Sequence, residues 1–305
     1  MSKKYWLLLL IGLPVLFLLW YFTIKNNDYA IKFEAKALPS EIVYRVDSPI
    51  FDKMEINNSE IKSDFSRVIQ ETELNAESYE LIWIIKPKND SISEVKVKVN
   101  NKNNSFKDRF FLLIGQNDFQ KEMKAEITYF KKALSTNHEL YTVKIEGESV
   151  SPGNTCACIT ANSKVDQKAF EMMKTIDILS NYILDNDLET RGRPRIQIKS
   201  WDKITKNINF SFCLPIAEMK SYPRNLLIDI QKISSRKALK ASFHGNYMFS
   251  HNAWFHLLDY AEKNNIEVKS ENILEIFKDN PQMGGNASLW EAEIYLPISE
   301  SNNLN

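Results

Sequence analysis

Residues 211–216, SFCLPI, and residues 293–298, EIYLPI, decide the fold of this 305-residue chain. Each stretch closes a run of segments in the order strand, strand, helix, strand, strand, and the two Leu-Pro-Ile endings lie 82 residues apart. The same order of elements in the same register predicts an internal repeat. We expect two halves, residues 140–216 and 222–298, that pack as a pseudo-dimer with a groove between them.

The elements of the repeat follow from apolar periodicity, which is two residues in strands and 3.6 in helices. In the first half we expect strands at 141–149 and 155–160, a helix at 165–187, and strands at 195–201 and 207–214. In the second half we expect strands at 226–233 and 237–243, a helix at 250–264, and strands at 273–277 and 288–297. Together the halves form a domain of residues 140–300.

Residues 26–137 show a different pattern and are expected to form a domain of their own. Alternation of apolar and polar residues predicts strands at 29–38, 65–74, 78–86 and 92–100. A helix is expected over residues 105–134, because Phe119, Met123, Ile127 and Phe130 recur at helical spacing. An antiparallel sheet closed by a long C-terminal helix is the helix-grip pattern, so the predicted fold class of the chain is α+β.

A resemblance to a known family is carried by the stretch from Lys237 to Ile298, with its segments KALKASFHGNY, AWFHLLDYAEKNNIEV, ILEIFKDNPQMGGN and WEAEIYLPI. It closely resembles the GyrI-like small-molecule-binding domain, also called the bacterial transcription-activator effector-binding domain. By pattern, residues 26–137 resemble a divergent START/polyketide-cyclase (SRPBCC) domain. The resemblance implies a ligand groove between the two halves of the repeat. No helix-turn-helix segment precedes the repeat, unlike in the transcription-factor relatives.

Glu293 is the first candidate for contact with a ligand. Side chains alternate between faces along a strand, so Glu293 shares a face with Tyr295. The resemblance implies that a glutamate of this strand lies in an aromatic-walled groove and meets cationic or polar ligands, whose charge ring faces also attract. The further candidates are Tyr295, Tyr247, Trp290 and Trp254, although Trp254 also fits the apolar face of its helix. On the residues alone, Glu293 also fits an exposed strand carboxylate.

The leading functional interpretation is a membrane-anchored, non-catalytic protein that binds a small apolar or cationic molecule near Glu293. One alternative is a GyrI-like hydrolase in which Glu293 acts as an acid–base group, which would require a pKa raised toward neutrality. Another alternative is a scaffold or inhibitor that binds a protein partner. No cofactor is expected.

The uncharged run at residues 5–24, YWLLLLIGLPVLFLLWYFTI, has the length of a membrane span and aromatic residues at both ends. It predicts a single-pass anchor within residues 1–25. Lys3 and Lys4 favour a cytoplasmic N-terminus, which leaves the body of the protein outside the cytoplasm. A cleaved signal peptide fits less well, because the run is longer than a usual apolar core and no small-residue cleavage site follows.

The charge and glycine counts exclude several classes of protein. The chain has 39 basic and 39 acidic residues, which argues against a nucleic-acid partner bound through a general basic field. Its eight glycines form neither a dinucleotide fingerprint nor a phosphate-binding loop. The spacing of His244, His251 and His256 does not suit a metal site, so no metal is expected.

The three cysteines leave two interpretations open. Cys156 and Cys158 flank one residue of a predicted strand, and Cys213 is remote in sequence. An odd number is not a disulfide framework, so the simplest interpretation is that all three are small buried apolar residues. A disulfide from Cys213 to either Cys156 or Cys158 is the alternative.

Overall fold

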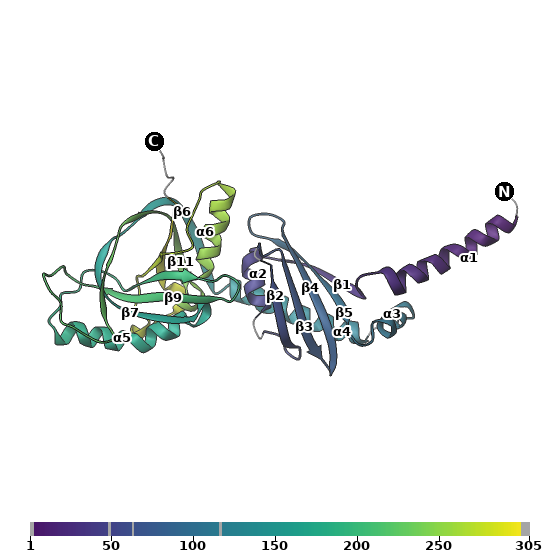
Figure 1. Ribbon diagram of the computed structural model, residues 1–305, viewed down its shortest axis with the longest axis horizontal. Helices are drawn as coiled ribbons and strands as arrows, with labels where there is room; N and C mark the ends of the chain where they lie inside the picture. Colours follow the sequence, from purple (N-terminus) through teal and green to yellow (C-terminus); the bar gives the residue numbers. More distant parts are fainter. Residues whose placement is uncertain (1–2, 48–49, 63, 116–117, 300–305) are drawn as a thin grey trace. The chain divides into compact units, whose positions relative to one another are not determined.

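Alternating residues between positions 29 and 101 form five antiparallel strands in the computed structural model, which describes residues 3–47, 50–62, 64–115 and 118–299 (Figure 1). The strands lie in the order β1-β5-β4-β3-β2, so the sheet is a meander whose last strand returns beside the first. Their bounds are Tyr29–Ala35 (β1), Glu55–Ile61 (β2), Arg67–Leu74 (β3), Glu77–Pro87 (β4) and Ser93–Asn101 (β5).

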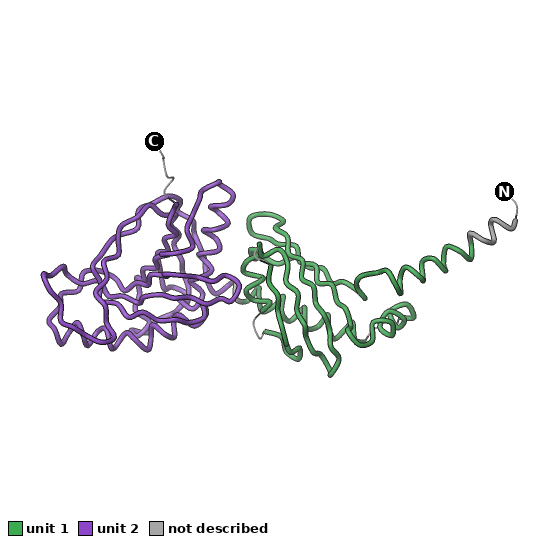
Figure 2. Tube along the Cα trace, viewed as in Figure 1, with its two compact units in different colours: residues 1–136 green, residues 137–305 purple. Residues whose placement is uncertain are grey.

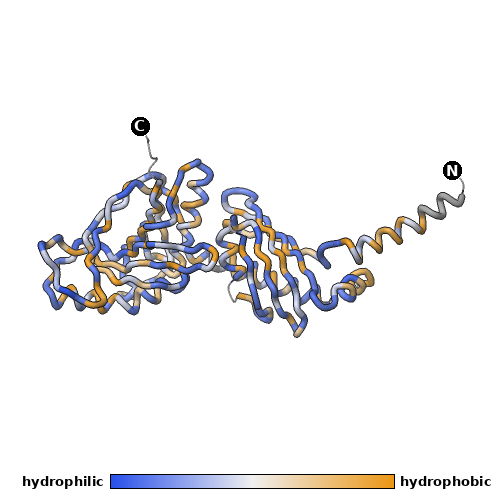
Figure 3. Tube along the Cα trace, viewed as in Figure 1, coloured by the Kyte–Doolittle hydropathy of each residue, from blue (hydrophilic) through white to orange (hydrophobic). Residues whose placement is uncertain are grey.

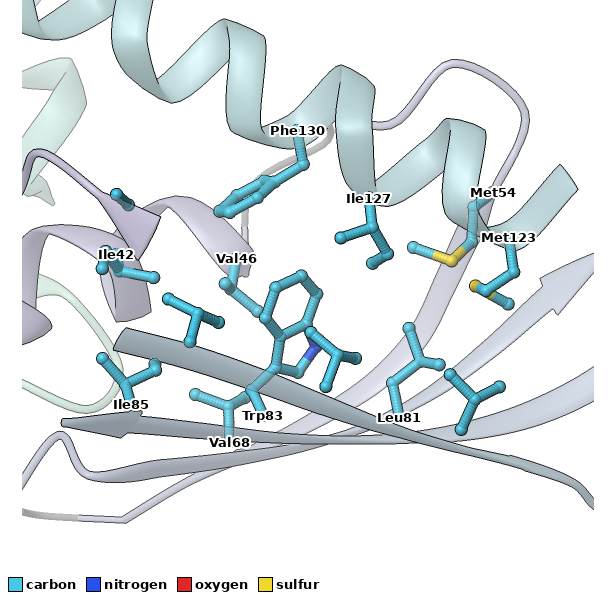
Figure 4. Close-up of a cluster of buried hydrophobic side chains, with 14 of the residues drawn as sticks. Ile42, Val46, Met54, Val68, Leu81, Trp83, Ile85, Met123, Ile127 and Phe130 are labelled. Atoms are coloured by element: carbon cyan, nitrogen blue, oxygen red, sulfur yellow. The ribbon is translucent and has the colours of Figure 1, made fainter. Parts of the chain in front are cut away.

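The apolar core of this sheet lies under two helices, α2 (Pro39–Val46) and α4 (Asp118–His138). Figure 4 shows Trp83 of the sheet close to Phe130 of α4; both side chains are fully buried, and their ring centroids are 5.2 Å apart. The helix buries the stripe predicted from its spacing, of which the fully buried members are Met123, Ile127 and Phe130. The long closing helix of the predicted helix-grip pattern is therefore present.

The helix predicted over residues 105–134 is interrupted. The structure has two helices here, α3 (Ser105–Leu113) and α4. Gly115 follows α3 with a φ of +78°, a left-handed conformation that commonly ends a helix and that glycine adopts without steric cost. The apolar spacing alone did not register this break.

The apolar N-terminal run forms the helix α1 (Lys3–Leu19), whose C-terminal part is mostly coloured as hydrophobic in Figure 3. Its α-helical hydrogen bonding ends at Leu19, and residues Trp20–Ile24 form a π-helical turn. Among the described residues, no helix is both long and apolar enough to cross a membrane. The prediction of a membrane anchor at residues 5–24, with the membrane as partner and a single-pass location, is therefore wrong by this criterion.

The chain divides into two compact units, residues 1–136 and residues 137–305 (Figure 2). The second unit has eight antiparallel strands in the order β10-β7-β9-β8-β12-β13-β11-β6. Their bounds are Tyr141–Ser151 (β6), Asn154–Lys164 (β7), Arg195–Trp201 (β8), Asn207–Pro215 (β9), Asp229–Ile233 (β10), Arg236–Gly245 (β11), Ile273–Phe277 (β12) and Glu291–Pro297 (β13). Two antiparallel sheets with covering helices confirm the predicted α+β class.

The strand order of the second unit has the symmetry of the predicted repeat. From the seam between β8 and β12, the order is β8-β9-β7 in one direction and β12-β13-β11 in the other. The outermost strands, however, are exchanged, because β6 of the first half pairs with β11 and β10 of the second half pairs with β7. The repeat is therefore an intertwined pair of halves, an exchange of strands that the order of elements in the sequence does not reveal.

This exchange forces the sheet to curve. Strand β10 lies at one edge of the sheet and β11 lies next to the other edge, yet only Ser234 and Ser235 connect them. Two residues span at most about 10 Å, so the two edges must approach each other at this end. The turn between β6 and β7 packs against the same connection, since a Cβ atom on Gly153 would lie 2.8 Å from the backbone nitrogen of Ser235.

The curved sheet has two different faces. Helices α5 (Lys168–Asp185) and α6 (Asn252–Lys263) cover one face, here called the helix face. The other, here called the inner face, carries a separate small apolar cluster at its closed end: Cys156, Cys158, Cys213, Ile233, Ala238, Leu274, Ile276 and Tyr295. Side chains near the edge of this cluster form the candidate site.

Candidate functional site

Glu293 lies on the inner face of β13. The strand alternates as predicted: Ala292, Ile294 and Leu296 are fully buried, while Glu293 retains 21% exposure of its side chain. Its register neighbours are Ser242 in β11 and Ile276 in β12. The carboxylate is therefore anchored on a central strand and is partly shielded from water.

Glu293 and four charged side chains around it alternate in sign and are called here the charged cluster: Glu146, Lys240, Glu293, Lys278 and Glu291. The Nζ atom of Lys240 lies 3.0 Å from a Glu146 carboxylate oxygen and 3.1 Å from Glu293 Oε1. The Nζ atom of Lys278 lies 2.6 Å from Glu291 Oε1 and 3.2 Å from Glu293 Oε1. Three carboxylates and two ammonium groups leave the cluster with a net charge of −1.

Two hydroxyl groups complete the cluster. The phenol of Tyr295 donates a hydrogen bond of 2.9 Å to Glu293 Oε2, and the hydroxyl of Ser242 donates to Glu146. The Lys240 ammonium also lies 5.7 Å from the centre of the Tyr295 ring, a cation–π distance. Burial and the hydrogen bond to Glu293 raise the pKa of Tyr295 to about 12, so this phenol remains a donor at neutral pH.

The pKa of Glu293 lies below its ordinary value. Burial alone would raise it, but the hydrogen bonds from Tyr295, Lys240 and Lys278 favour the charged form and outweigh burial. The carboxylate is therefore ionised at neutral pH. A hydrolase using Glu293 as a proton donor would need a pKa shifted in the opposite direction.

The equivalent positions in the first half have different chemistry. Ser211 stands where Glu293 stands, and its hydroxyl is 2.9 Å from that of Thr160. A disulfide between Cys158 and Cys213 stands in place of the Lys240–Tyr295 pair, because the two cysteines are directly opposite each other in β7 and β9. The simplest interpretation of the sequence, three unpaired cysteines, is therefore wrong, and the alternative disulfide joins Cys158 to Cys213. Cys156 is a buried thiol whose pKa burial raises to about 11.

A hollow of about 1000 Å³ opens at the far end of the inner face in the first half. Asn162, Ser200 and Asn209 contribute to its wall, from β7, β8 and β9, and Lys269 and Glu271 add charge from a neighbouring loop. No member of the charged cluster lines this hollow. The inner face therefore offers two chemically distinct regions, and the hollow is a competing location for a ligand.

Tyr247 and Trp290 lie beside the start of β13. Their ring centroids are 5.4 Å apart. The hydroxyl of buried Tyr247 donates to the backbone oxygen of Glu291 at 2.8 Å and accepts from the backbone nitrogen of Asp279. These contacts hold the backbone that carries Glu291, so Tyr247, against which the Trp290 ring packs, supports one end of the charged cluster.

Trp254 lies on the helix face and is fully buried. Its indole nitrogen donates to Glu275 at 2.6 Å, and its ring meets Trp201 at 5.0 Å between centroids. Of the five residues selected from the sequence, the structure brings Glu293 and Tyr295 into direct contact and places Trp254 against the opposite face of the sheet.

The sequence selection missed Lys240, Lys278, Glu146 and Ser242. A signal existed for Lys240 and Ser242, since they alternate with buried Leu239, Ala241 and Phe243 in KALKASF, but their register against Glu293 could not be read from it. Glu146 approaches from β6, and Lys278 approaches from the position directly after β12. In the described part of the chain, no group of three or more His, Cys, Asp or Glu side chains has the geometry to hold a metal ion.

The comparisons with known proteins give weak structural likenesses. No family model matches the chain, and no curated protein is similar to it. One solved structure that resembles it is the EcmrR C-terminal domain, with 17% sequence identity and a TM-score of 0.45 over 53% of this chain and 99% of that one. Another is EcmrR in its DNA complex, with 15% identity and a TM-score of 0.43 over 66% of this chain and 73% of that one. A third, from Staphylococcus aureus MU50, is described as a putative bacterial transcription regulation protein. It has 14% sequence identity and a TM-score of 0.37, over 52% of this chain and 99% of that one.

At such identities and TM-scores these neighbours assign no function to this chain. The prediction that nucleic acid is not a partner conflicts with the match to a DNA complex and is withdrawn. That prediction rested on overall charge balance, which says nothing about a partner bound by a local surface.

Proposed function

We propose that the second unit binds a small organic cation on its inner face, with Glu293 as the principal charged contact. The observation that carries this proposal is the ionised, partly buried Glu293 carboxylate within a cluster whose net charge is negative. A carboxylate in a partly desolvated setting attracts a cation more strongly than one in water. The same role is implied by the sequence resemblance to GyrI-like effector-binding domains.

The surroundings of Glu293 also suit the apolar part of such a ligand. Ile276 lies beside Glu293 in the register of the sheet, and Tyr295 lies next to it along the inner face. The Lys240 ammonium over the Tyr295 ring is a native example of a cation resting on this aromatic face. The side chains of Ile276 and Tyr295 are almost fully buried and Lys240 covers the Tyr295 ring, so the apolar part of an organic cation would meet the rim of this apolar cluster while its charge pairs with Glu293.

The test is isothermal titration calorimetry with benzamidine, a flat aromatic cation, and with benzamide, its neutral analogue. Wild-type protein is expected to prefer benzamidine, and Glu293→Gln is expected to weaken benzamidine binding by about 1–3 kcal/mol while leaving benzamide unaffected. Glu271→Gln is the matched control, because Glu271 lines the hollow of the first half. Equal binding to wild type and Glu293→Gln, or a loss seen in Glu271→Gln instead, would overturn the proposal.

A further inference from the structure

We infer that Lys278 is a tethered competitor for the cation of the ligand and thereby determines which cations the site accepts. This inference rests on the proposed function. The Lys278 ammonium bridges Glu291 and Glu293, at 2.6 and 3.2 Å, and so occupies the position between two carboxylates that an incoming cation would take. A ligand must displace this side chain to reach both acids.

The backbone of Lys278 is fixed while its side chain is free to leave. The residue directly follows β12, and its backbone nitrogen donates to the backbone oxygen of Glu291 at 2.9 Å. Its side chain is 39% exposed, and its two ion-pair partners are both members of the charged cluster. Release of the ammonium into water therefore requires only rotation about side-chain bonds.

Lys240 differs from Lys278 in each of these respects. Its side chain is 18% exposed, and its ammonium is held by Glu146, Glu293 and the face of Tyr295. It also lies within β11, between two paired strands. Lys240 is therefore the permanent member of the cluster, and Lys278 is the exchangeable one.

Departure of Lys278 leaves the two acids unequally satisfied. Glu293 keeps Lys240 and Tyr295, whereas the carboxylate of Glu291 keeps His244, whose Nε2 is 4.0 Å away. The space left by the Lys278 ammonium is thus lined by the carboxylates of Glu291 and Glu293. Both can accept hydrogen bonds from new N–H donors in place of those that Lys278 supplied. Amidinium, guanidinium and primary ammonium groups supply such donors, and a quaternary cation supplies charge without them.

Replacement of Lys278 removes the competitor and should strengthen binding. We expect Lys278→Met to bind benzamidine about three- to tenfold more tightly than wild type, as follows from the strength of partly exposed ion pairs. Tetraphenylphosphonium, which has no N–H donor, should gain less. Lys199→Met is the matched control, because Lys199 lies in the first half and its ammonium reaches Thr160.

Calorimetry on wild type, Lys278→Met, Lys278→Gln and the double variant Lys278→Met/Glu293→Gln separates the inference from the proposed function. Tighter benzamidine binding in both Lys278 variants, abolished in the double variant, supports the inference. Binding that depends on Glu293 but is unchanged or weaker in both Lys278 variants overturns the inference and leaves the proposed function standing. Absence of preference for benzamidine over benzamide in every variant overturns both.

Discussion

The phenol of Tyr295 donates a 2.9 Å hydrogen bond to the carboxylate of Glu293, two residues away on the same face of the same strand. The strand repeat of two residues places the groups side by side, and burial of the ring directs its hydroxyl at the acid. Tyr295 thus joins the apolar cluster of the inner face to the charged cluster. It also helps to keep Glu293 ionised, which the proposed ligand contact requires.

Tyr295→Phe should raise the pKa of Glu293 toward its ordinary value, because one stabilising donor to the charged form is lost. Carboxyl-carbon NMR titration measures this directly. Because the folded pKa is depressed, ionised Glu293 stabilises the fold above its ordinary pKa, and this contribution is lost as the pH falls through the folded value. In Tyr295→Phe that loss should occur at higher pH.

Tyr182→Phe is the control for this titration, since the Tyr182 hydroxyl donates to the backbone oxygen of Pro223 rather than to an acid. The account predicts no shift of the Glu293 pKa in that variant. An unchanged Glu293 pKa in Tyr295→Phe would show that the hydrogen bond does not hold the carboxylate in its charged form.

A buried ion pair joins the two halves of the second unit on the helix face of the sheet. The ammonium of Lys168, in α5, lies 3.7 Å from Glu275, in β12, and donates to Ser250 at 2.7 Å. Burial lowers the pKa of Lys168. Lys168→Met leaves the Glu275 charge buried without its cation, so the free energy of unfolding should fall by about 3–5 kcal/mol in urea denaturation.

Lys174→Met provides the comparison for this loss, because Lys174, six residues further along α5, forms a partly exposed pair with Glu171. Its replacement should change the free energy of unfolding by less than about 1 kcal/mol. Similar effects of the two substitutions would contradict a structural role for the buried pair.

Reduction of the Cys158–Cys213 disulfide should destabilise the second unit. The bridge closes a loop with a sequence separation of 55, for which the chain-entropy model gives a contribution of about 4 kcal/mol. Urea unfolding with and without reductant measures it. Cys158→Ala/Cys213→Ala should reproduce the reduced protein, whereas Cys156→Ala should remain sensitive to reductant; insensitivity of the wild type would disprove the bridge.

The sequence predicted those parts of the molecule that depend on local periodicity. Alternation placed Glu293 and Tyr295 on one face of β13, and helical spacing found the buried stripe that includes Met123. The matching order of elements revealed the repeat. Each of these features depends on the apolar pattern within one segment, which can be read from the sequence of that segment alone.

Features that depend on register between distant strands could not be predicted in this way. The register of β7 against β9 places Cys158 opposite Cys213 and Cys156 opposite Pro215. A register shifted by two residues would have placed Cys156 opposite Cys213 instead, and the sequence does not distinguish the two registers. Exchange of β6 and β10 between the halves is likewise invisible in the order of the elements. The contacts of Lys278 with Glu291 and Glu293 were also not predictable, because Lys278 follows β12 and reaches two acids of β13 only through the pairing of these strands.

The most direct test of cation binding at Glu293 is a crystal structure of the full chain determined from crystals soaked with benzamidine. We expect an amidinium within hydrogen-bond distance of Glu293 and Glu291, with the Lys278 side chain turned away into solvent. Benzamidine bound in the hollow beside Asn162 and Asn209, with Lys278 still bridging the two acids, would contradict it.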